Sequence, residues 1–180
     1  MRVQSLNHLI EVVRAVARPT RVLVLGSSSL LPHHPELGGP GQVLELTTDA
    51  DLLLEPVNEA IAESLQVAVG KDSAFMAEFG YYADILRPSI ADTLPAGWER
   101  RLQPVPGYDH VFALDPYDLA VVKLVVGRLK DLDLLRALLR LRIVEPERLR
   151  QHYQSTPLDE REALIAGRKL QMVLGELGRQ

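Results

Sequence analysis

An acidic pair opens the most strand-like segment of this chain. In the segment TTDADLLLEP, residues 47–56, three leucines follow one another and a proline ends the run. Asp49 and Asp51 stand near its start, although aspartate is depleted in strands. Because side chains two residues apart on a strand point to the same face, the pair would direct two negative charges at one point. A sheet that contains this segment must therefore present carboxylates on one of its faces.

Helical and strand-like patterns alternate along the rest of the chain. Apolar residues recur every three to four positions in the helical segments, and short apolar runs that stop at glycine or proline mark the strands. Residues 27–42 are rich in Ser, Pro, His and Gly, which predicts a long loop with one helical turn at 29–31. The pattern predicts helices at 6–17 with an N-cap at Ser5, 56–69, 116–142, 145–153 and 155–177, and strands at 21–26, 43–54, 78–88 and within 94–114.

The order of these elements predicts an α+β fold. We expect a small mixed β-sheet packed by helices, followed by a helical C-terminal part. Residues 1–114 would form the sheet-containing core, and residues 115–180 the helical part, packed on the core as one unit. A chain of 180 residues is long enough for one domain with a substantial core.

The composition excludes several classes of protein. The chain has no Cys, which rules out disulfides and thiolate metal sites and fits a reducing cytoplasm. Its longest apolar runs fall short of the roughly 20 residues that a membrane span needs. The N-terminal segment has charges within its apolar pattern and predicts an amphipathic helix rather than a signal peptide. We therefore expect a cytoplasmic protein without a membrane partner.

Charge is distributed unevenly along the chain. The net charge is −4, but residues 121–180 hold 12 Lys and Arg against 8 Asp and Glu, whereas residues 1–120 hold 8 against 16. An acidic first part and a basic last part suit a metal-loaded acidic site beside a surface that tolerates phosphates. A charged, solvated helix surface explains the basic part equally well.

A glycine followed by hydroxyl residues ends the first predicted strand. Gly26 would let backbone N–H groups approach a phosphate, and the hydroxyls of Ser27 and Ser28 would add contacts. An ordinary strand-ending turn uses the same residue types, so the pattern alone leaves both interpretations open.

Three aspartates could form a metal site. Asp49 and Asp51 repel each other unless a cation lies between them, and their hard oxygen ligands suit Mg²⁺ or Mn²⁺. Asp84 lies in the next predicted strand, from which a third carboxylate could reach the same site. Three carboxylates around two cations can support in-line phosphoryl or nucleotidyl transfer. In the structural alternative, the pair caps a turn and Asp84 pairs with Arg87 or Lys71.

These features resemble the polymerase-β-type nucleotidyltransferase superfamily. In that superfamily, Gly-Ser follows a first strand, Asp-x-Asp lies on a second and a lone Asp lies on a third. The chain is most similar to an uncharacterised bacterial group within it. The segments that carry the resemblance are GSSSLLPHHPE, DAD, FGYYAD, LPAGWERRL and DLAVVKLVVGRLKDLDLLRALL, and they cover about residues 21–150.

The resemblance implies roles for the residues singled out above. The catalytic and metal-holding residues would be Asp49, Asp51 and Asp84. The phosphate-binding residues would be Gly26, Ser27 and Ser28. The implied cofactor is Mg²⁺ or Mn²⁺, the implied substrate is an NTP, and the acceptor would be a hydroxyl of an RNA, a protein or a small molecule.

A more distant similarity, to abortive-infection-type nucleotidyltransferase toxins, concerns the last part of the chain. Those toxins carry a similar Lys followed by an (R/K)D pattern, which implies that Lys123 binds NTP phosphates and that Asp131 orients it. On one continuous helix, Lys123, Gly127, Lys130 and Asp131 would share a face, and Gly127 would permit close backbone approach. Alternatively, Lys123 extends along an apolar helix to reach water. The similarity also implies a toxin–antitoxin component with an antitoxin partner.

One departure from the superfamily pattern supports a second hypothesis. Here 21 residues, 28–48, separate Ser27 from Asp49, whereas the superfamily usually has a shorter connection. The extra residues form either a surface insertion or a segment that displaces the phosphate-binding turn. In the second case the chain would be a catalytically inactive nucleotidyltransferase fold that acts as a nucleotide- or partner-binding module.

Overall fold

The computed structural model describes residues 1–177, which fall into two compact units. The first unit contains Met1–Thr93 and Arg101–Asp115, and the second contains Leu94–Arg100 and the chain from Pro116 onward. The first unit carries the β-sheet, and the second is helical.

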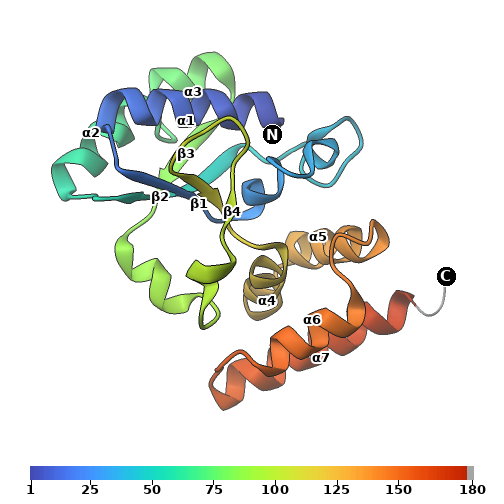
Figure 1. The fold of residues 1–180 in the computed structure, drawn as a ribbon. Coiled ribbons are helices and arrows are strands. Elements are labelled where there is room, and N and C mark those ends of the chain that lie inside the picture. Colours follow the sequence, from blue (N-terminus) through green and yellow to red (C-terminus); the bar gives the residue numbers. More distant parts are fainter. Residues whose placement is uncertain (178–180) are drawn as a thin grey trace. The chain divides into compact units, whose positions relative to one another are not determined.

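A mixed five-stranded sheet forms the centre of the first unit (Figure 1). Its strands are β1 (Arg21–Val24), β2 (Asp49–Glu55), β3 (Tyr82–Ile85), β4 (Gln103–Pro104) and β5 (Val111–Ala113). The spatial order is β3-β2-β1-β5-β4. β2 pairs with β3 and β1 with β5 in parallel, whereas β1 and β2, and β4 and β5, are antiparallel. The predicted α+β fold with a small mixed sheet is confirmed.

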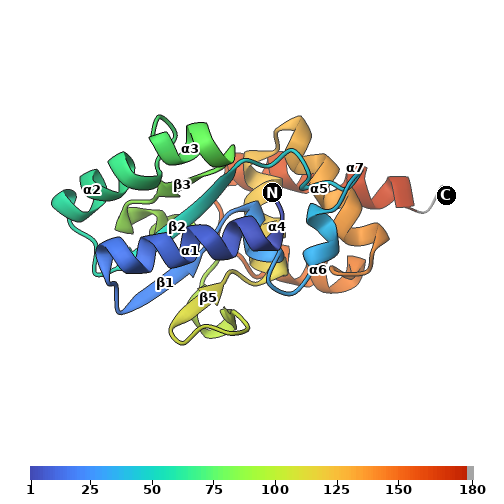
Figure 2. The same ribbon diagram turned by 90° about the horizontal axis from the view of Figure 1, so that it is seen from above.

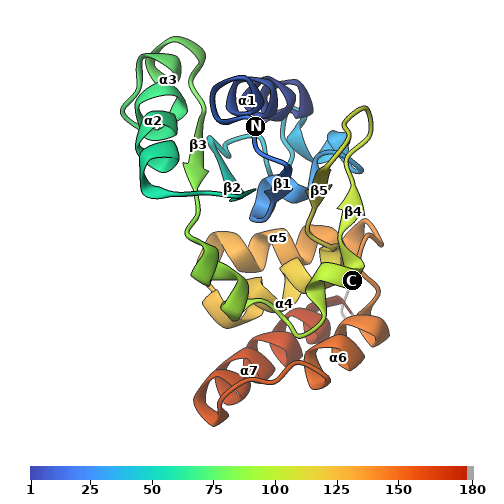
Figure 3. The same ribbon diagram turned by 60° about the vertical axis from the view of Figure 1, so that its left-hand side comes forward.

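Three helices lie on one side of this sheet (Figures 1 and 3). They are α1 (Val3–Ala17), α2 (Glu59–Val69) and α3 (Ala74–Phe79). The buried residues of α1 follow the spacing of an amphipathic helix and are Leu6, Leu9, Ile10 and Val13. The core of the first unit is therefore concentrated between these helices and one face of the sheet.

Within the residues that the structure describes, the second unit contains four α-helices. They are labelled in Figure 2. They are α4 (Pro116–Val126), α5 (Leu129–Arg140), α6 (Pro146–Gln154) and α7 (Glu160–Leu177). α4 contacts each of the other three, and most of its residues are buried. Because it is apolar nearly all round, α4 is the central helix of this unit.

The segment 78–88 is not one strand, as the sequence suggested. Ser73 caps α3 by accepting a hydrogen bond from the Met76 N–H at 3.1 Å, and Gly80 ends the helix with φ of 77°. The strand β3 begins only at Tyr82. The prediction missed α3 because its six residues are too few for a clear helical period.

Other predicted boundaries move by a few residues. β2 begins at Asp49, so residues 43–48 belong to the preceding loop. α1 begins after Arg2 rather than after Ser5. α2 begins after Asn58, whose side chain accepts the Ile61 N–H at 2.9 Å, rather than at Pro56.

The predicted helix 116–142 is broken at Gly127. This glycine has φ of 61°, a left-handed conformation that ends α4, and α5 starts two residues later. A Cβ at Gly127 would lie 1.7 Å from Nζ of Lys169. That Nζ donates hydrogen bonds to the last carbonyls of α4, those of Leu124 at 3.1 Å and Val125 at 3.2 Å. Gly127 therefore permits the close approach of the Lys169 side chain, which comes from α7.

We expect Gly127→Ala to lower the free energy of unfolding by about 1–3 kcal/mol, because an alanine there is strained and pushes the Lys169 ammonium away from the carbonyls that it binds. Urea unfolding monitored by circular dichroism measures this loss. Gly41→Ala is the matched control, because Gly41 has φ of 74° but open space around it. A loss at Gly127 no larger than at Gly41 would show that displacing Lys169 costs no stability.

Candidate active site

Four side chains, those of Asp49, Asp51, Tyr82 and Asp84, form a group that we call the acidic square. It lies on the face of the sheet opposite to the helices α1, α2 and α3. In the parallel register of β2 and β3, Asp49 pairs with Tyr82 and Asp51 pairs with Asp84. Residues paired in this way, and residues two apart on a strand, share a face. Asp84 is exposed and the other three are half-buried. The structure therefore places all three predicted carboxylates on one face, with Tyr82 beside them.

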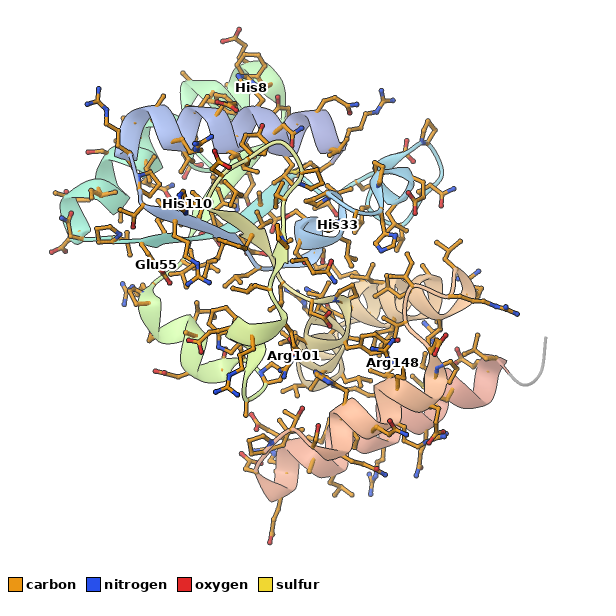
Figure 4. The ribbon with its side chains drawn as sticks, in the orientation of Figure 1. His8, His33, Glu55, Arg101, His110 and Arg148 are labelled. Atoms are coloured by element: carbon orange, nitrogen blue, oxygen red, sulfur yellow. The ribbon has the colours of Figure 1, made fainter. Side chains whose placement is uncertain are left out.

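Tyr81 identifies which face the helices cover. Its hydroxyl lies 2.9 Å from Nδ1 of His8 on α1, and its ring packs with those of His8 and Phe75. Figure 4 shows His8 on this helix. Tyr81 directly precedes β3, and because side chains alternate along an extended chain, Tyr82 points to the opposite face from Tyr81. The acidic square lies on that opposite face.

Gly26 lies directly against Asp51. A Cβ added to this glycine would stand 1.6 Å from Oδ2 of Asp51, so only glycine fits without a shift. The backbones are linked as well, because the Leu25 N–H donates to the Asp51 carbonyl at 2.9 Å. The end of β1 and the acidic pair therefore belong to one site.

The serines after Gly26 form a tight turn, η1 (Ser27–Leu30). The Ser29 N–H donates to the Gly26 carbonyl at 3.0 Å, so the N–H groups of Ser27 and Ser28 precede the first hydrogen bond of the turn. Ser27 is half-buried, whereas the hydroxyls of Ser28 and Ser29 are enclosed and have no hydrogen-bond partner among residues 1–177. Of the two predicted phosphate-binding hydroxyls, that of Ser27 is the one nearer solvent.

The long connection 28–48 is a packed segment. It contains a second turn, η2 (Pro35–Gly38), and the leucines that it buries are Leu30, Leu31, Leu37 and Leu44. Gly38 lies against the carbonyl of Met1, where a Cβ would be 2.3 Å away. Figure 4 shows His33 within this segment. Because Gly26 still contacts Asp51, the extra residues do not displace the turn from the acidic pair.

The aspartates of the acidic square affect the pKa of the Tyr82 phenol. Burial raises the pKa of its phenol, and the negative charges of Asp49, Asp84 and Asp51 raise it further. Within residues 1–177, however, no three His, Asp or Glu side chains are grouped so that they could hold a metal ion. Any ion bound here would therefore need oxygen ligands beyond the protein side chains.

In the second unit, Lys123 and Asp131 do contact each other. Lys123 Nζ lies 3.4 Å from Oδ1 of Asp131, and their side chains are 9% and 2% exposed. Arg128 binds the same carboxylate, with Nε at 2.8 Å from Oδ2 and Nη2 at 3.2 Å from Oδ1. The contact crosses the junction between α4 and α5, so the prediction of one shared helix face was wrong, and Lys130 is exposed.

The neighbours of Asp131 determine its ionisation. Burial raises the pKa of this carboxyl, but hydrogen bonds from Arg128 and the charge of Lys123 outweigh burial and hold the pKa below its usual range. Asp131 therefore stays negatively charged at neutral pH. Its charge is shared between two cations, so the three side chains together carry a net positive charge.

Sequence reasoning missed Tyr82 and Arg128. Tyr82 lies within the segment FGYYAD, but only the register of β2 and β3 shows that it pairs with Asp49. A signal for it existed, because it lies two residues before Asp84 on the same strand. Arg128 immediately follows the glycine that breaks the helix, and its role became visible only once that break was known.

A mixed α+β sheet with aspartates on neighbouring strands and a Gly-Ser turn beside them is typical of the nucleotidyltransferase class of proteins. The family model described as "Nucleotidyltransferase of unknown function (DUF6036)" matches residues 2–164, and the chain belongs to this family. No curated protein and no solved structure matches the chain. Among residues 1–177, no helix is both long and apolar enough to cross a membrane.

Asp131→Asn should destabilise the protein by about 3–5 kcal/mol at pH 7, because it leaves Lys123 buried without its counter-charge. A carboxyl with a lowered pKa stabilises the fold above its unfolded-state pKa of about 4, and this contribution is lost as the pH falls through the folded-state value. Urea unfolding of both proteins should therefore show a difference at pH 7 that shrinks below about pH 4.

Asp133→Asn is the matched control. Asp133 is exposed and pairs with Arg136 at 2.9 Å, so its loss should cost less than about 1 kcal/mol. Equal losses for the two variants would contradict the buried role of Asp131.

Proposed function

We propose that this protein is a metal-dependent nucleotidyltransferase that moves a nucleotidyl group from an NTP to a hydroxyl acceptor. One observation carries the proposal: Asp49, Asp51 and Asp84 share a sheet face, and Gly26 lies against Asp51. Membership of a nucleotidyltransferase family supports the same class of reaction.

Asp49 and Asp51 would hold Mg²⁺ or Mn²⁺, with Asp84 as a candidate third ligand. In nucleotide sites, Mg²⁺ usually takes one or two protein carboxylates and completes its shell with substrate phosphates and water. Two aspartates on one face therefore fit the ion, even though no three acidic or imidazole side chains in residues 1–177 form a cage. When bound, the ion would neutralise charge on the transferring phosphate and favour ionisation of the attacking hydroxyl.

The protein's own groups would orient the reactants and move the proton. The N–H groups of Ser27 and Ser28 would bind the β- and γ-phosphates, with the Ser27 hydroxyl beside them. Asp84 would take the proton of the acceptor hydroxyl, whose oxygen forms a bond to the α-phosphorus. The bond from that phosphorus to the β-phosphate oxygen breaks, and pyrophosphate leaves.

Lys123 would bind nucleotide phosphates, as the similarity to the toxins implies. What supports this role is the net positive charge of the group formed by Lys123, Arg128 and Asp131. Asp131 would position the Lys123 ammonium. A role in a toxin–antitoxin pair, with an antitoxin as protein partner, is part of the proposal on the same resemblance alone.

The alternative function is that of a catalytically inactive module that binds a nucleotide or a partner. The specific observation that favours it is the absence, within residues 1–177, of a three-residue group able to hold a metal ion. Such a module would bind an NTP without releasing pyrophosphate.

The main test measures label transfer from each [α-³²P]NTP with Mg²⁺ or Mn²⁺, using RNA, protein and a metabolite extract as acceptors. We expect transfer by the wild type, and a loss of about 100-fold or more in Asp49→Asn and Asp51→Asn, because the metal ligands are removed. Asp109→Asn, an exposed aspartate outside the square, should retain wild-type activity. Metal-dependent NTP binding without transfer would favour the inactive module, and no binding at all would sink both functions.

A second prediction concerns stability and needs no substrate. Asp84 faces Asp51 across the strands, and like charges directly opposite each other are destabilising. Asp84→Asn should therefore stabilise the metal-free protein by about 0.2–1 kcal/mol. Mn²⁺ should raise the thermal midpoint of the wild type, and raise that of Asp84→Asn by less. An identical shift in both proteins would mean that Asp84 is not a ligand of the ion.

A further inference from the structure

The helix α7 of the second unit has apolar residues on two of its faces. The residues that it buries, on the side of α4 and α5, are Ala166, Leu170 and Val173. A second set is exposed to solvent, with exposed fractions of 56% at Leu164, 40% at Ile165 and 40% at Met172. By helical spacing these three lie within an arc of about 100°, on the side away from the buried residues. We call them the apolar stripe, because exposed apolar side chains grouped on one face mark an interaction surface.

A hollow lies between α6 and α7, which run side by side (Figures 1 and 3). Its volume is about 270 Å³, and Leu170 and Leu174 supply its apolar surface. Tyr153 of α6 also lines it, and its hydroxyl donates to the Ala163 carbonyl at 2.6 Å. This hydroxyl would lie 2.9 Å from a Cβ at Gly167, so the glycine lets the tyrosine lie against α7.

The hollow and the apolar stripe are neighbours on α7. Gln171, which lines the hollow, lies about 20° from Leu164 by helical spacing. The hollow is smaller than the roughly 300–1,000 Å³ of small-molecule sites, so it suits a single apolar side chain better than a metabolite. A hole between two helices beside an exposed apolar stripe is the surface that an amphipathic helix needs, with one side chain as anchor and others along the stripe.

The charged groups on this side of the unit are mainly cationic. Arg161 and Arg168 lie within the arc of the apolar stripe, and neither has a carboxylate partner among residues 1–177. Arg150 lines the hollow and pairs with Glu147 at 2.8 Å, but both side chains are exposed, so the pair is weak. The other carboxylate on this side of α7 is that of Glu160, in the first turn. Three arginines against two carboxylates favour a partner that carries acids beside its apolar residues.

Two other occupants fit this surface poorly. If two copies of the apolar stripe packed antiparallel, they would meet at their midpoint and place Arg168 against its own counterpart, and like charges in an interface cost free energy. A lipid surface is disfavoured because the stripe has only three side chains and α7 contains no aromatic residue.

We infer that the apolar stripe and the hollow form a docking surface for an acidic amphipathic helix of another protein. One apolar side chain of that helix would enter the hollow, and the following turns would contact Leu164 and Met172. Its carboxylates would pair with Arg161 and Arg168. The surface lies within the second unit, and the inference does not depend on nucleotidyl transfer.

The test measures the binding of fluorescently labelled synthetic peptides to the full chain by anisotropy. The first peptide has about 18 residues, enough for a helix, with leucines at helical spacing on one face and glutamates on both sides of them. A matched peptide has lysine at every glutamate position. We expect the acidic peptide to bind at least about tenfold more tightly than the basic one, by a margin that shrinks as salt is added. Replacing the central leucine of the acidic peptide by alanine should weaken binding about tenfold, because the hollow loses its anchor.

Variants of the chain locate the surface. Leu164→Ser and Arg168→Glu should each weaken binding of the acidic peptide about tenfold, and both side chains are exposed, so the thermal midpoint should change little. Val67→Ser and Lys71→Glu are the matched controls, because they change an exposed apolar residue and an exposed lysine in the first unit. Both controls should bind the peptide as the wild type does.

Several results would overturn the inference. They are equal binding of the acidic and basic peptides, equal binding by all variants, and dissociation constants weaker than about 1 mM for every peptide. Sedimentation velocity and flotation with phosphatidylcholine–phosphatidylglycerol vesicles test the other two occupants. A dimer that Leu164→Ser dissociates would assign the surface to a second copy, and vesicle binding that Arg168→Glu abolishes would assign it to a membrane.

Discussion

The parallel pairing of β2 with β3 is the constraint on which the acidic site depends. Hydrogen bonds from the Tyr82 N–H to the Thr48 carbonyl, at 2.9 Å, and from the Leu86 N–H to the Leu52 carbonyl, at 2.8 Å, fix its register. Ala50 and its partner Ala83 are buried on the helix-covered face, which forces the aspartates to the other face. A slip of one residue would bury the carboxylates and expose the apolar side chains. Burial of one face therefore creates the acidic face on the other.

The sequence predicted those features of the acidic site that lie within a single strand. Asp49 and Asp51 lie two residues apart on one strand, so their shared face could be predicted from spacing alone. The pairing of Asp51 with Asp84 joins strands separated by α2 and α3, and no single-strand pattern specifies such a register. The contact of Gly26 with Asp51 was equally hidden, because it depends on the antiparallel register of β1 with β2, in which Val24 pairs with Leu52.

The break between α4 and α5, in the second unit, is another feature that depends on contacts between distant segments and that the sequence pattern did not predict. A glycine inside a helix costs only about 1 kcal/mol relative to alanine, so the apolar pattern of residues 116–142 outweighed it in the prediction. The side chain of Lys169, which lies on α7, occupies the space beside Gly127 and bonds the last carbonyls of α4. Tertiary contact thus overrides a continuous helical pattern and brings Arg128 to Asp131 as the cap of α5.

Two arrangements in the first unit bear on what the acidic face is for. Asp51 and Asp84 stand opposite each other, and two enclosed serine hydroxyls in the adjoining turn have no partner among residues 1–177. Each arrangement costs free energy in the protein alone, and stability by itself would favour neutral side chains opposite each other and no orphaned hydroxyls. A cation beside the aspartates would offset their repulsion, and phosphates beside the turn would attract that cation. The proposed metal-bound NTP would supply both charges at once, whereas an uncharged partner would supply neither.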